Sequence, residues 1–247
     1  MGGKMALIKD EFLAAAREVL PEFATDTLAD KLDLLAAHLA DVGSRMNLTA
    51  ITEPSAVVWL HLIDSLYAAR VLSGIAGSIP SMKIADVGSG GGFPALPVAA
   101  ALPNMQVTAI DSTEKKCNYI IGAAEVMGLG NVSAEAVRAE EFARTDARES
   151  FGAVTARAVA RLNVLMELCL PLVGIGGLFI SMKGATAEEE AREAEAAAKK
   201  LGAVLYDKIS YTLPGYGDKR MILVYRKIAH TPAEYPRQYS KISKNPL

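Results

Sequence analysis

The pattern of hydrophobic positions along the chain changes near residue 80. Before that point apolar residues recur at spacings of three and four, which predicts amphipathic helices. We expect a first helix over roughly residues 6–20, a second through Leu28–Val42 and a third from about Pro54 to Leu72, with Pro21 separating the first two. Residues 1–80 therefore predict a helical N-terminal subdomain.

From Lys83 onward, short apolar strands alternate with helical segments. This alternation is typical of a doubly wound α/β sheet with helices on both faces. A short Pro-Gly loop after Leu213 predicts that the last two strands form an antiparallel hairpin at one edge. We therefore assign residues 81–247 to one domain with seven strands, expected at Lys83–Val87, Gln106–Ile110, Asn131–Ala136, Ala153–Ala156, Gly177–Met182, Ala203–Tyr211 and Arg220–Lys227.

The first expected strand leads into a glycine-rich turn, Gly88–Pro94, and the second ends in Asp111 about twenty residues later. Glycines let a ligand approach the backbone, and the later carboxylate can accept hydrogen bonds from two ribose hydroxyls. A dinucleotide fingerprint would place a glycine where Phe93 stands, and Asp86 would repel a pyrophosphate. A cationic ligand suits Asp86 better, so the pattern favours S-adenosylmethionine over a turn that merely reverses the chain.

Composition adds modest limits. With 247 residues, 51% hydrophobic, 22% charged and a net charge of −2, the chain has the make-up of a soluble globular protein and no global attraction to nucleic acid or membrane. Cys117 and Cys169 have no metal-ligand spacing, so we expect no metal, no disulfide and a reducing cytoplasm. No run approaches the ~20 apolar residues of a membrane span, and Met1–Lys4 begins no secretory signal. The acidic segment Thr186–Lys200 predicts a solvated helix, with no further role for Glu188–Glu190.

Short motifs are spread over most of the length: Asn47–Ile51, His61–Leu66, Asp86–Pro94, Asp111-Ser112, Arg138–Glu141, Ala156–Ala158, Leu178–Gly184 and Tyr235–Arg237. Taken together they resemble the glucose-inhibited division protein B family, bacterial methyltransferases that modify a guanine of 16S ribosomal RNA at N7. Two small residues, Gly91 and Ala95, and a less basic tail after Arg237 depart from the family pattern. The resemblance implies a Rossmann-like methyltransferase sheet, S-adenosylmethionine as cofactor, and 16S ribosomal RNA or a small-subunit particle as partner.

The expected cofactor contacts follow the carboxyl ends of the strands, where open α/β sheets bind ligands. Two glycines would face the methionine part, an aromatic ring would form one wall, and a carboxylate with its neighbouring serine would hold the ribose. The resemblance implies adenine contacts after the third strand, and an arginine ends the fourth. These candidates are Gly88, Gly90, Phe93, Asp111, Ser112, Ala139, Glu140 and Arg157.

Three polar residues of the N-terminal part are candidates for substrate positioning: Asn47, His61 and Asp64. His61 and Asp64 lie three positions apart and share one helix face. They can form a His–carboxylate pair that positions RNA or gates the pocket, or they can tie the helical part to the sheet. Asn47 and Thr49 can cap a turn, and the resemblance implies that they face the cofactor mouth.

We expect no general base, because neutral guanine carries no proton at N7. Local cations can supply phosphate contacts despite the low net charge; the candidates are Arg45, Arg157, Arg237, Lys241 and Lys244. Two alternatives share the same cofactor half: a methyltransferase for a small molecule, and an S-adenosylmethionine-binding regulator without catalysis.

Overall fold

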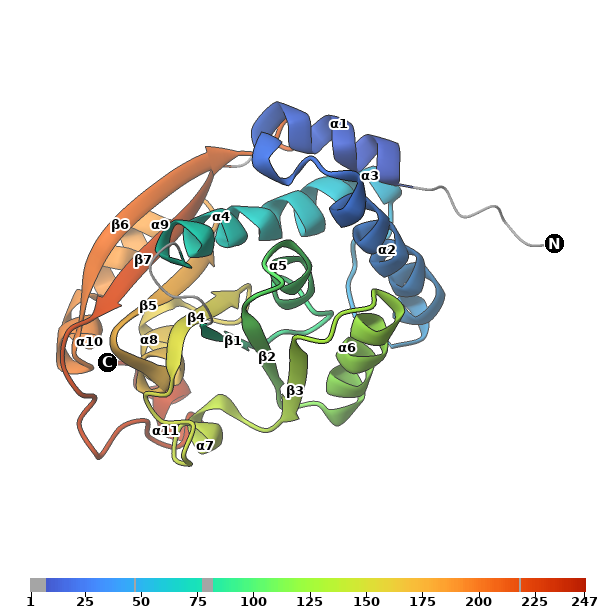
Figure 1. Ribbon diagram of the computed structural model, residues 1–247. Coiled ribbons are helices and arrows are strands. Elements are labelled where there is room, and N and C mark those ends of the chain that lie inside the picture. Colours follow the sequence, from blue (N-terminus) through green and yellow to red (C-terminus); the bar gives the residue numbers. More distant parts are fainter. Residues whose placement is uncertain (1–7, 47, 77–81, 218) are drawn as a thin grey trace.

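The computed structural model describes residues 8–46, 48–76, 82–217 and 219–247 (Figure 1). Its centre is a seven-stranded sheet in the order β3-β2-β1-β4-β5-β7-β6. The first five strands pair in parallel, and β7 pairs antiparallel with both β5 and β6. The predicted doubly wound sheet and its edge hairpin are therefore confirmed. The strands are β1 (Lys83–Val87), β2 (Gln106–Asp111), β3 (Val132–Ala136), β4 (Phe151–Arg157), β5 (Val173–Lys183), β6 (Ala203–Thr212) and β7 (Lys219–Lys227).

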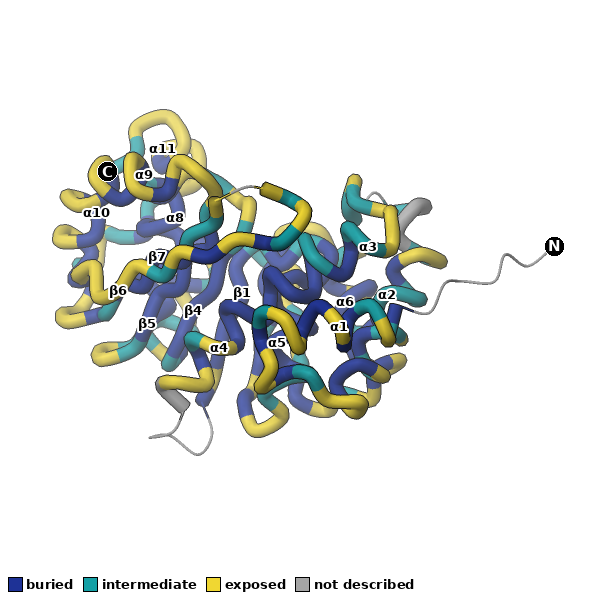
Figure 2. Tube along the Cα trace, turned by 90° about the horizontal axis from the view of Figure 1, so that it is seen from above, coloured by how far each residue is buried: buried dark blue, intermediate teal, exposed yellow. Residues whose placement is uncertain are grey.

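Helices cover both faces of the sheet. One hydrophobic cluster joins the sheet to α1 (Lys9–Val19), α2 (Asp26–Met46), α4 (Asp64–Ala76), α5 (Ala95–Ala101) and α6 (Glu114–Val126). A second cluster joins the opposite face to α7 (Ala139–Phe142), α8 (Leu162–Cys169), α9 (Ala187–Glu193), α10 (Glu195–Lys200) and α11 (Tyr239–Lys244). Figure 2 shows the central strands buried between these layers and most of β6 exposed at the edge.

The N-terminal helices share a continuous core with the sheet. Phe12 of α1, Leu35 of α2 and Leu66 of α4 belong to the same buried cluster as Ile84 of β1 and Ile180 of β5. Such packing is expected for amphipathic helices whose apolar stripe has no other surface to cover. The expected boundary near residue 80 falls within residues 77–81, outside the described residues. The division into residues 1–80 and 81–247 stays a prediction.

The third predicted helix is a continuous helical stretch of three parts: α3 (Pro54–Val57), a π-helical segment (Val58–Ile63) and α4. By length and composition alone, Pro54–Gly74 is apolar enough to cross a membrane, so the expectation that no run approaches a membrane span is wrong. In the structure 67% of the 18-residue window that passes this test is buried inside the protein. Its apolar residues therefore form the core between the N-terminal helices and the sheet.

The acidic segment at residues 186–200 differs from the solvated helix that was predicted. It forms two helices, α9 and α10, whose alanines pack into the second cluster. Glu190 is buried and has its own role: its carboxylate pairs with Lys183 at 2.8 Å and accepts the Leu162 amide at 2.8 Å. The prediction that this acidic run has no role beyond solvation is wrong for Glu190, because position 190 faces β5 and α8.

Candidate active site

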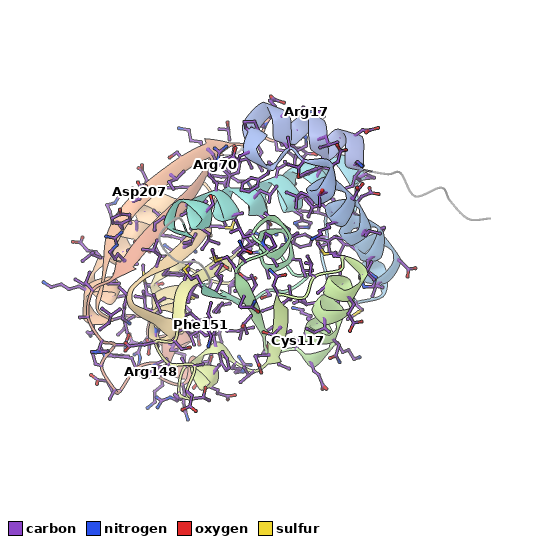
Figure 3. All side chains as sticks on the ribbon, in the orientation of Figure 1. Arg17, Arg70, Cys117, Arg148, Phe151 and Asp207 are labelled. Carbon is purple, nitrogen blue, oxygen red and sulfur yellow. The ribbon has the colours of Figure 1, made fainter. Side chains whose placement is uncertain are left out.

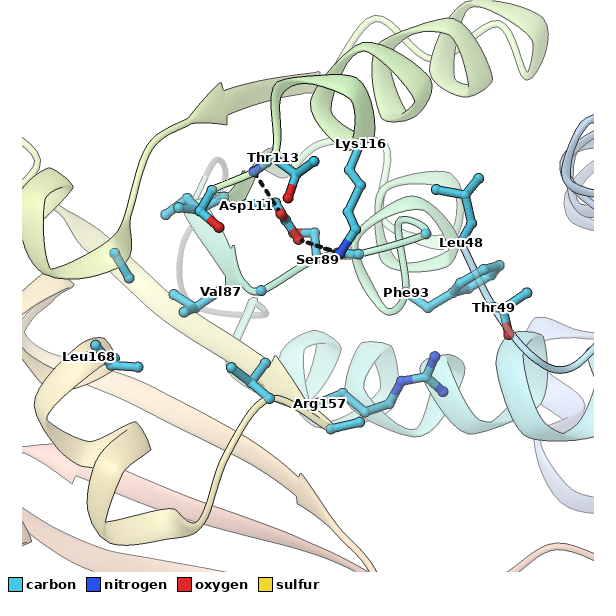
Figure 4. A pocket seen from close by; sticks show the side chains of 18 of the residues that line it. Leu48, Thr49, Val87, Ser89, Phe93, Asp111, Thr113, Lys116, Arg157 and Leu168 are labelled. Carbon is cyan, nitrogen blue, oxygen red and sulfur yellow. Dashed lines mark hydrogen bonds and ion pairs between the residues drawn. The ribbon is translucent and has the colours of Figure 1, made fainter. Parts of the chain in front are cut away.

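A cavity of about 580 Å³ opens at the carboxyl ends of β1, β2 and β4 (Figure 4). All the expected cofactor contacts line it: Gly88, Gly90, Phe93, Asp111, Ser112, Ala139, Glu140 and Arg157. His61 lines it as well, and Asp64 is not among the lining residues. Asn47 lies outside the described residues, so its expected position stays a prediction. The structure thus brings together side chains from both halves of the chain.

The glycine-rich turn is fixed against the end of β2. The amides of Gly88 and Ser89 both donate to the Ile110 carbonyl, at 2.8 and 3.1 Å. Gly88 has a φ of +73°, and a Cβ at this position would lie 2.4 Å from Val159 Cγ2. Position 88 therefore requires glycine for its backbone conformation and for the close approach of the loop after β4.

Asp111 connects the turn to the start of α6. Its Oδ2 accepts the Gly90 amide at 3.1 Å and its Oδ1 accepts the Thr113 amide at 2.9 Å (Figure 4). Lys116 Nζ lies 3.7 Å from Oδ2. A carboxylate offers about four acceptor positions, so the two amide hydrogen bonds leave capacity for two ligand hydroxyls, and Lys116 at 3.7 Å is an ion-pair contact beyond hydrogen-bond distance. Asp111 is thus both a brace for the glycine turn and an acceptor at the cavity wall.

Asp86 does not lie where the sequence argument placed it. Its side chain is buried, its Oδ1 accepts the Thr155 hydroxyl at 2.7 Å, and it is not among the residues lining the cavity. Burial raises the pKa of the Asp86 carboxyl to about 6. The Asp86 carboxyl therefore does not face the cavity, because it points into the sheet, toward β4.

Arg157 joins the helical half to the sheet. One terminal nitrogen donates to Asp64 Oδ2 and to the Leu60 carbonyl, both at 2.8 Å, and the other lies 3.2 Å from His61 Nδ1. Its guanidinium also lies 5.7 Å from the centroid of the Phe93 ring. An arginine has only donors, so His61 Nδ1 must be an acceptor in this contact.

The tautomer of His61 follows from these contacts. With Nδ1 accepting, the proton resides on Nε2, which lies 2.8 Å from the Thr49 hydroxyl and donates to it. Burial and the charge of Arg157 lower the pKa of His61 to about 3. The ring also stacks on Phe93, with centroids 4.5 Å apart. His61 is therefore a neutral, fixed wall of the cavity near physiological pH.

Asp64 has a structural role. It is 1% exposed and accepts from Arg157, from the Tyr211 hydroxyl at 2.7 Å and from Arg220 at 3.4 Å. These partners come from β4, β6 and β7. Asp64 and His61 each bond to Arg157 and not to one another, so the alternative in which they tie the helical part to the sheet holds for Asp64.

Sequence reasoning missed several cavity residues. Thr113 and Lys116, at the start of α6, both contact Asp111, a place that the strand-to-helix pattern could have indicated. Ala158 follows β4 with a φ of +56°, which no sequence signal reveals. Tyr239 reaches the cavity from the C-terminal helix, and only the chain's path through space could place it there.

The expected phosphate-binding cations have different environments. Arg157 and Arg237 are both engaged by buried carboxylates, Arg237 through a two-pronged contact with Glu167 at 2.6 and 2.9 Å. Lys241 and Lys244 are exposed on α11. Arg45 lies in α2, and its side chain is not described. Only the two lysines therefore remain as described candidates from this set.

Comparison with known proteins gives the family. The sequence model of rRNA small subunit methyltransferase G matches residues 28–212, more than half of the chain. This chain belongs to that family. It is similar to the ribosomal RNA small subunit methyltransferase G of Staphylococcus saprophyticus, with 42% identity over 85% of this chain and 86% of that protein. The Bacillus subtilis protein of the same name is 41% identical, over 88% of this chain and 90% of that protein.

Solved structures agree on the fold of this methyltransferase family member. TYW2 from M. jannaschii, in complex with AdoMet, has a TM-score of 0.53 and 14% identity over 67% of this chain and 77% of its own. TrmN from Thermus thermophilus has a TM-score of 0.52 and 20% identity over 69% of this chain and 53% of its own. Within residues 8–46, 48–76, 82–217 and 219–247, no group of three or more His, Cys, Asp or Glu could hold a metal ion.

Proposed function

We propose that this chain transfers a methyl group from S-adenosylmethionine to N7 of a guanine in 16S ribosomal RNA of the small ribosomal subunit, in the cytoplasm. The observation that carries the proposal is the glycine turn at the cavity, which Asp111 braces, in a chain that belongs to the rRNA small subunit methyltransferase G family. The cavity, about 580 Å³, lies within the roughly 300–1,000 Å³ typical of small-molecule sites. Its close-fitting glycine loop and its carboxylate suit a nucleoside cofactor.

The cofactor side of the cavity would hold the ligand through groups from three strand ends. Asp111 would accept the ribose hydroxyls beside Ser112, while Gly88 and Gly90 would allow the methionine part to lie against the backbone. The turn after β3, with Ala139 and Glu140, would contact the adenine. When bound, S-adenosylmethionine supplies an electrophilic methyl group on a sulfonium.

The opposite wall, formed by Thr49, His61, Phe93 and Arg157, would position the acceptor, and Phe93 and Arg157 would also contact the cofactor. Neutral guanine has an in-plane lone pair at N7 and no proton there, so no residue has to remove one. His61 is suited to positioning the acceptor without removing a proton, because its Nδ1 already accepts a hydrogen bond from Arg157 and its pKa is about 3. The catalytic contribution is alignment of the reacting atoms, which can supply up to about 7–11 kcal/mol.

The experiment offers labelled S-adenosylmethionine with three acceptors: small-subunit particles from cells that lack the enzyme, naked 16S RNA, and bulk transfer RNA. We expect label in the first or second and little in the third, and strand cleavage by borohydride and aniline at the modified guanine. Asp111→Ala should weaken cofactor binding by roughly one to several orders of magnitude, because charge-assisted hydrogen bonds contribute about 1.5–3 kcal/mol each. Asp207→Ala, which removes an exposed carboxylate of β6, is the matched control.

The outcomes separate the alternatives. Label in a metabolite extract and not in RNA would indicate a small-molecule methyltransferase. Cofactor binding without transfer to any cell fraction would indicate a regulator. Methylated guanine that resists the cleavage chemistry would contradict N7 as the acceptor.

A further inference from the structure

The C-terminal segment, residues 230–247, carries the exposed Lys241 and Lys244, and it also reaches the cavity. Tyr239, the first residue of α11, lines the cavity and is 40% exposed. Its ring lies beside Arg138, with the guanidinium carbon 5.2 Å from the ring centroid. Arg138 directly precedes Ala139 and Glu140. The Tyr239 ring therefore stands at the end of the cavity that the turn after β3 forms.

The segment is fastened at several points before it reaches Tyr239. Arg148 donates to the Thr231 and Tyr235 carbonyls, at 2.7 and 2.8 Å. Arg237 forms its two-pronged contact with the fully buried Glu167 of α8. Arg148 lies at the end of the molecule where α7 and α11 are found (Figures 1 and 3).

Packing continues beyond Tyr239, since Ile242 of α11 is fully buried in the second hydrophobic cluster. The chain is thus anchored both before and after Tyr239, which fixes the place of this residue at the cavity. A preorganised aromatic side chain contributes to binding without a large ordering cost.

Tyr239 also separates two cavities. A second cavity, of about 620 Å³, is lined by Glu141, Arg144, Arg237, Gln238 and Ser240, together with Glu140 and Tyr239. Glu140 and Tyr239 are the two residues that these two cavities share. Removal of the Tyr239 ring would therefore open the end of the first cavity into the second.

We propose that Tyr239 is a positioning residue that closes the adenine end of the S-adenosylmethionine site by packing its ring against the purine. The inference rests on the proposed function, because it assumes that the adenine lies at the turn after β3. Aromatic stacking on a base is sequence-tolerant and strong enough that losing one ring weakens binding roughly tenfold or more.

The test measures dissociation constants by calorimetric titration for two probes, S-adenosylmethionine and adenosine. For Tyr239→Ala we expect both affinities to fall roughly tenfold, with KM for the cofactor rising and kcat at saturating cofactor unchanged. Tyr239→Phe keeps the ring and should bind both probes like the wild type. Tyr239→Leu keeps apolar volume without the ring and should resemble Tyr239→Ala, which separates the loss of the aromatic ring from the loss of volume.

A matched control is available on the far edge of the sheet. Tyr206 of β6 is also exposed and stacks with an arginine, Arg226, at 3.8 Å, and it lines neither cavity. Tyr206→Ala should leave both affinities unchanged. If the wild type binds S-adenosylmethionine and Tyr239→Ala binds both probes equally well, the inference is overturned and the proposed function stands. If the wild type fails to bind S-adenosylmethionine, the proposed function itself fails.

Discussion

Replacing Arg157 by alanine tests whether the buried charge network supports the fold around the cavity. The substitution removes the strongest partner of Asp64, a carboxylate that is 1% exposed, while Arg157 itself is 13% exposed. Breaking a buried pair on one side typically costs about 3–5 kcal/mol, because the remaining charge is left without compensation. Tyr211 stays at 2.7 Å and Arg220 at 3.4 Å, so we expect a value near the lower end, about 3 kcal/mol.

The assay is urea unfolding followed by the fluorescence of Trp59, the one tryptophan of the chain, which lies in the helical segment beside Leu60. The same Arg157→Ala change is then made in an Asp64→Asn background. There it should cost much less, because a neutral amide does not need a cation. The difference between the two backgrounds measures the coupling of the pair.

Two results would refute this reasoning. A cost below about 1 kcal/mol for Arg157→Ala would place the pair among weak surface contacts. An equal cost in both backgrounds would show that Arg157 stabilises the fold through its contacts with Leu60 and Phe93 and not through Asp64.

Three further predictions concern the buried ionisable side chains His61, Asp86 and Glu190. The pKa of His61 is about 3 in the folded state and 6.5 in the unfolded state, so below pH 6.5 the unfolded state binds a proton that the folded state does not, and the protein loses stability as pH falls. His61→Gln should therefore flatten the pH dependence of the urea midpoint between pH 4 and 6.5. An unchanged slope would contradict the assignment of a neutral His61. The pH dependence from Asp86 has the opposite sign, because its folded pKa of about 6 exceeds its unfolded pKa of 3.8, so the protein loses stability as pH rises through 6. Asp86→Asn should therefore raise the melting temperature at pH 8 and leave it unchanged at pH 4. A lower melting temperature of this variant at pH 8 would contradict the raised pKa of Asp86. Glu190→Ala should lower the free energy of unfolding in urea by about 3 kcal/mol, because it removes the carboxylate that pairs with Lys183 and accepts the Leu162 amide. Replacement of the exposed neighbour, Glu188→Ala, should change that free energy by no more than about 0.5 kcal/mol. Equal effects of the two substitutions would refute the buried role of Glu190.

The local parts of this protein could be predicted from its sequence. Short apolar runs between helical segments located all seven strands, since strands of a sheet covered on both faces are nearly continuously buried, and the Pro-Gly loop after Leu213 located the edge hairpin. The glycine turn and Asp111 also lay within reach, because a strand–turn–helix unit of about thirty residues fixes their relation. The expected cofactor contacts all came from such strand ends.

Tertiary structure alone decided which distant residues meet. Arg157 reaches Asp64 from 93 positions away, and Tyr211 reaches the same carboxylate from 147 positions away. No periodicity records such contacts, because they depend on how the N-terminal helices pack across the sheet. For the same reason the sequence does not reveal that the Asp86 side chain faces into the sheet or that Glu190 faces a lysine of β5. The sequence by itself determined the strands of the sheet and the glycine turn that precedes the cofactor site. The packing of the helices on the sheet determined the cavity wall opposite that turn and the place of Tyr239 at the end of the cavity.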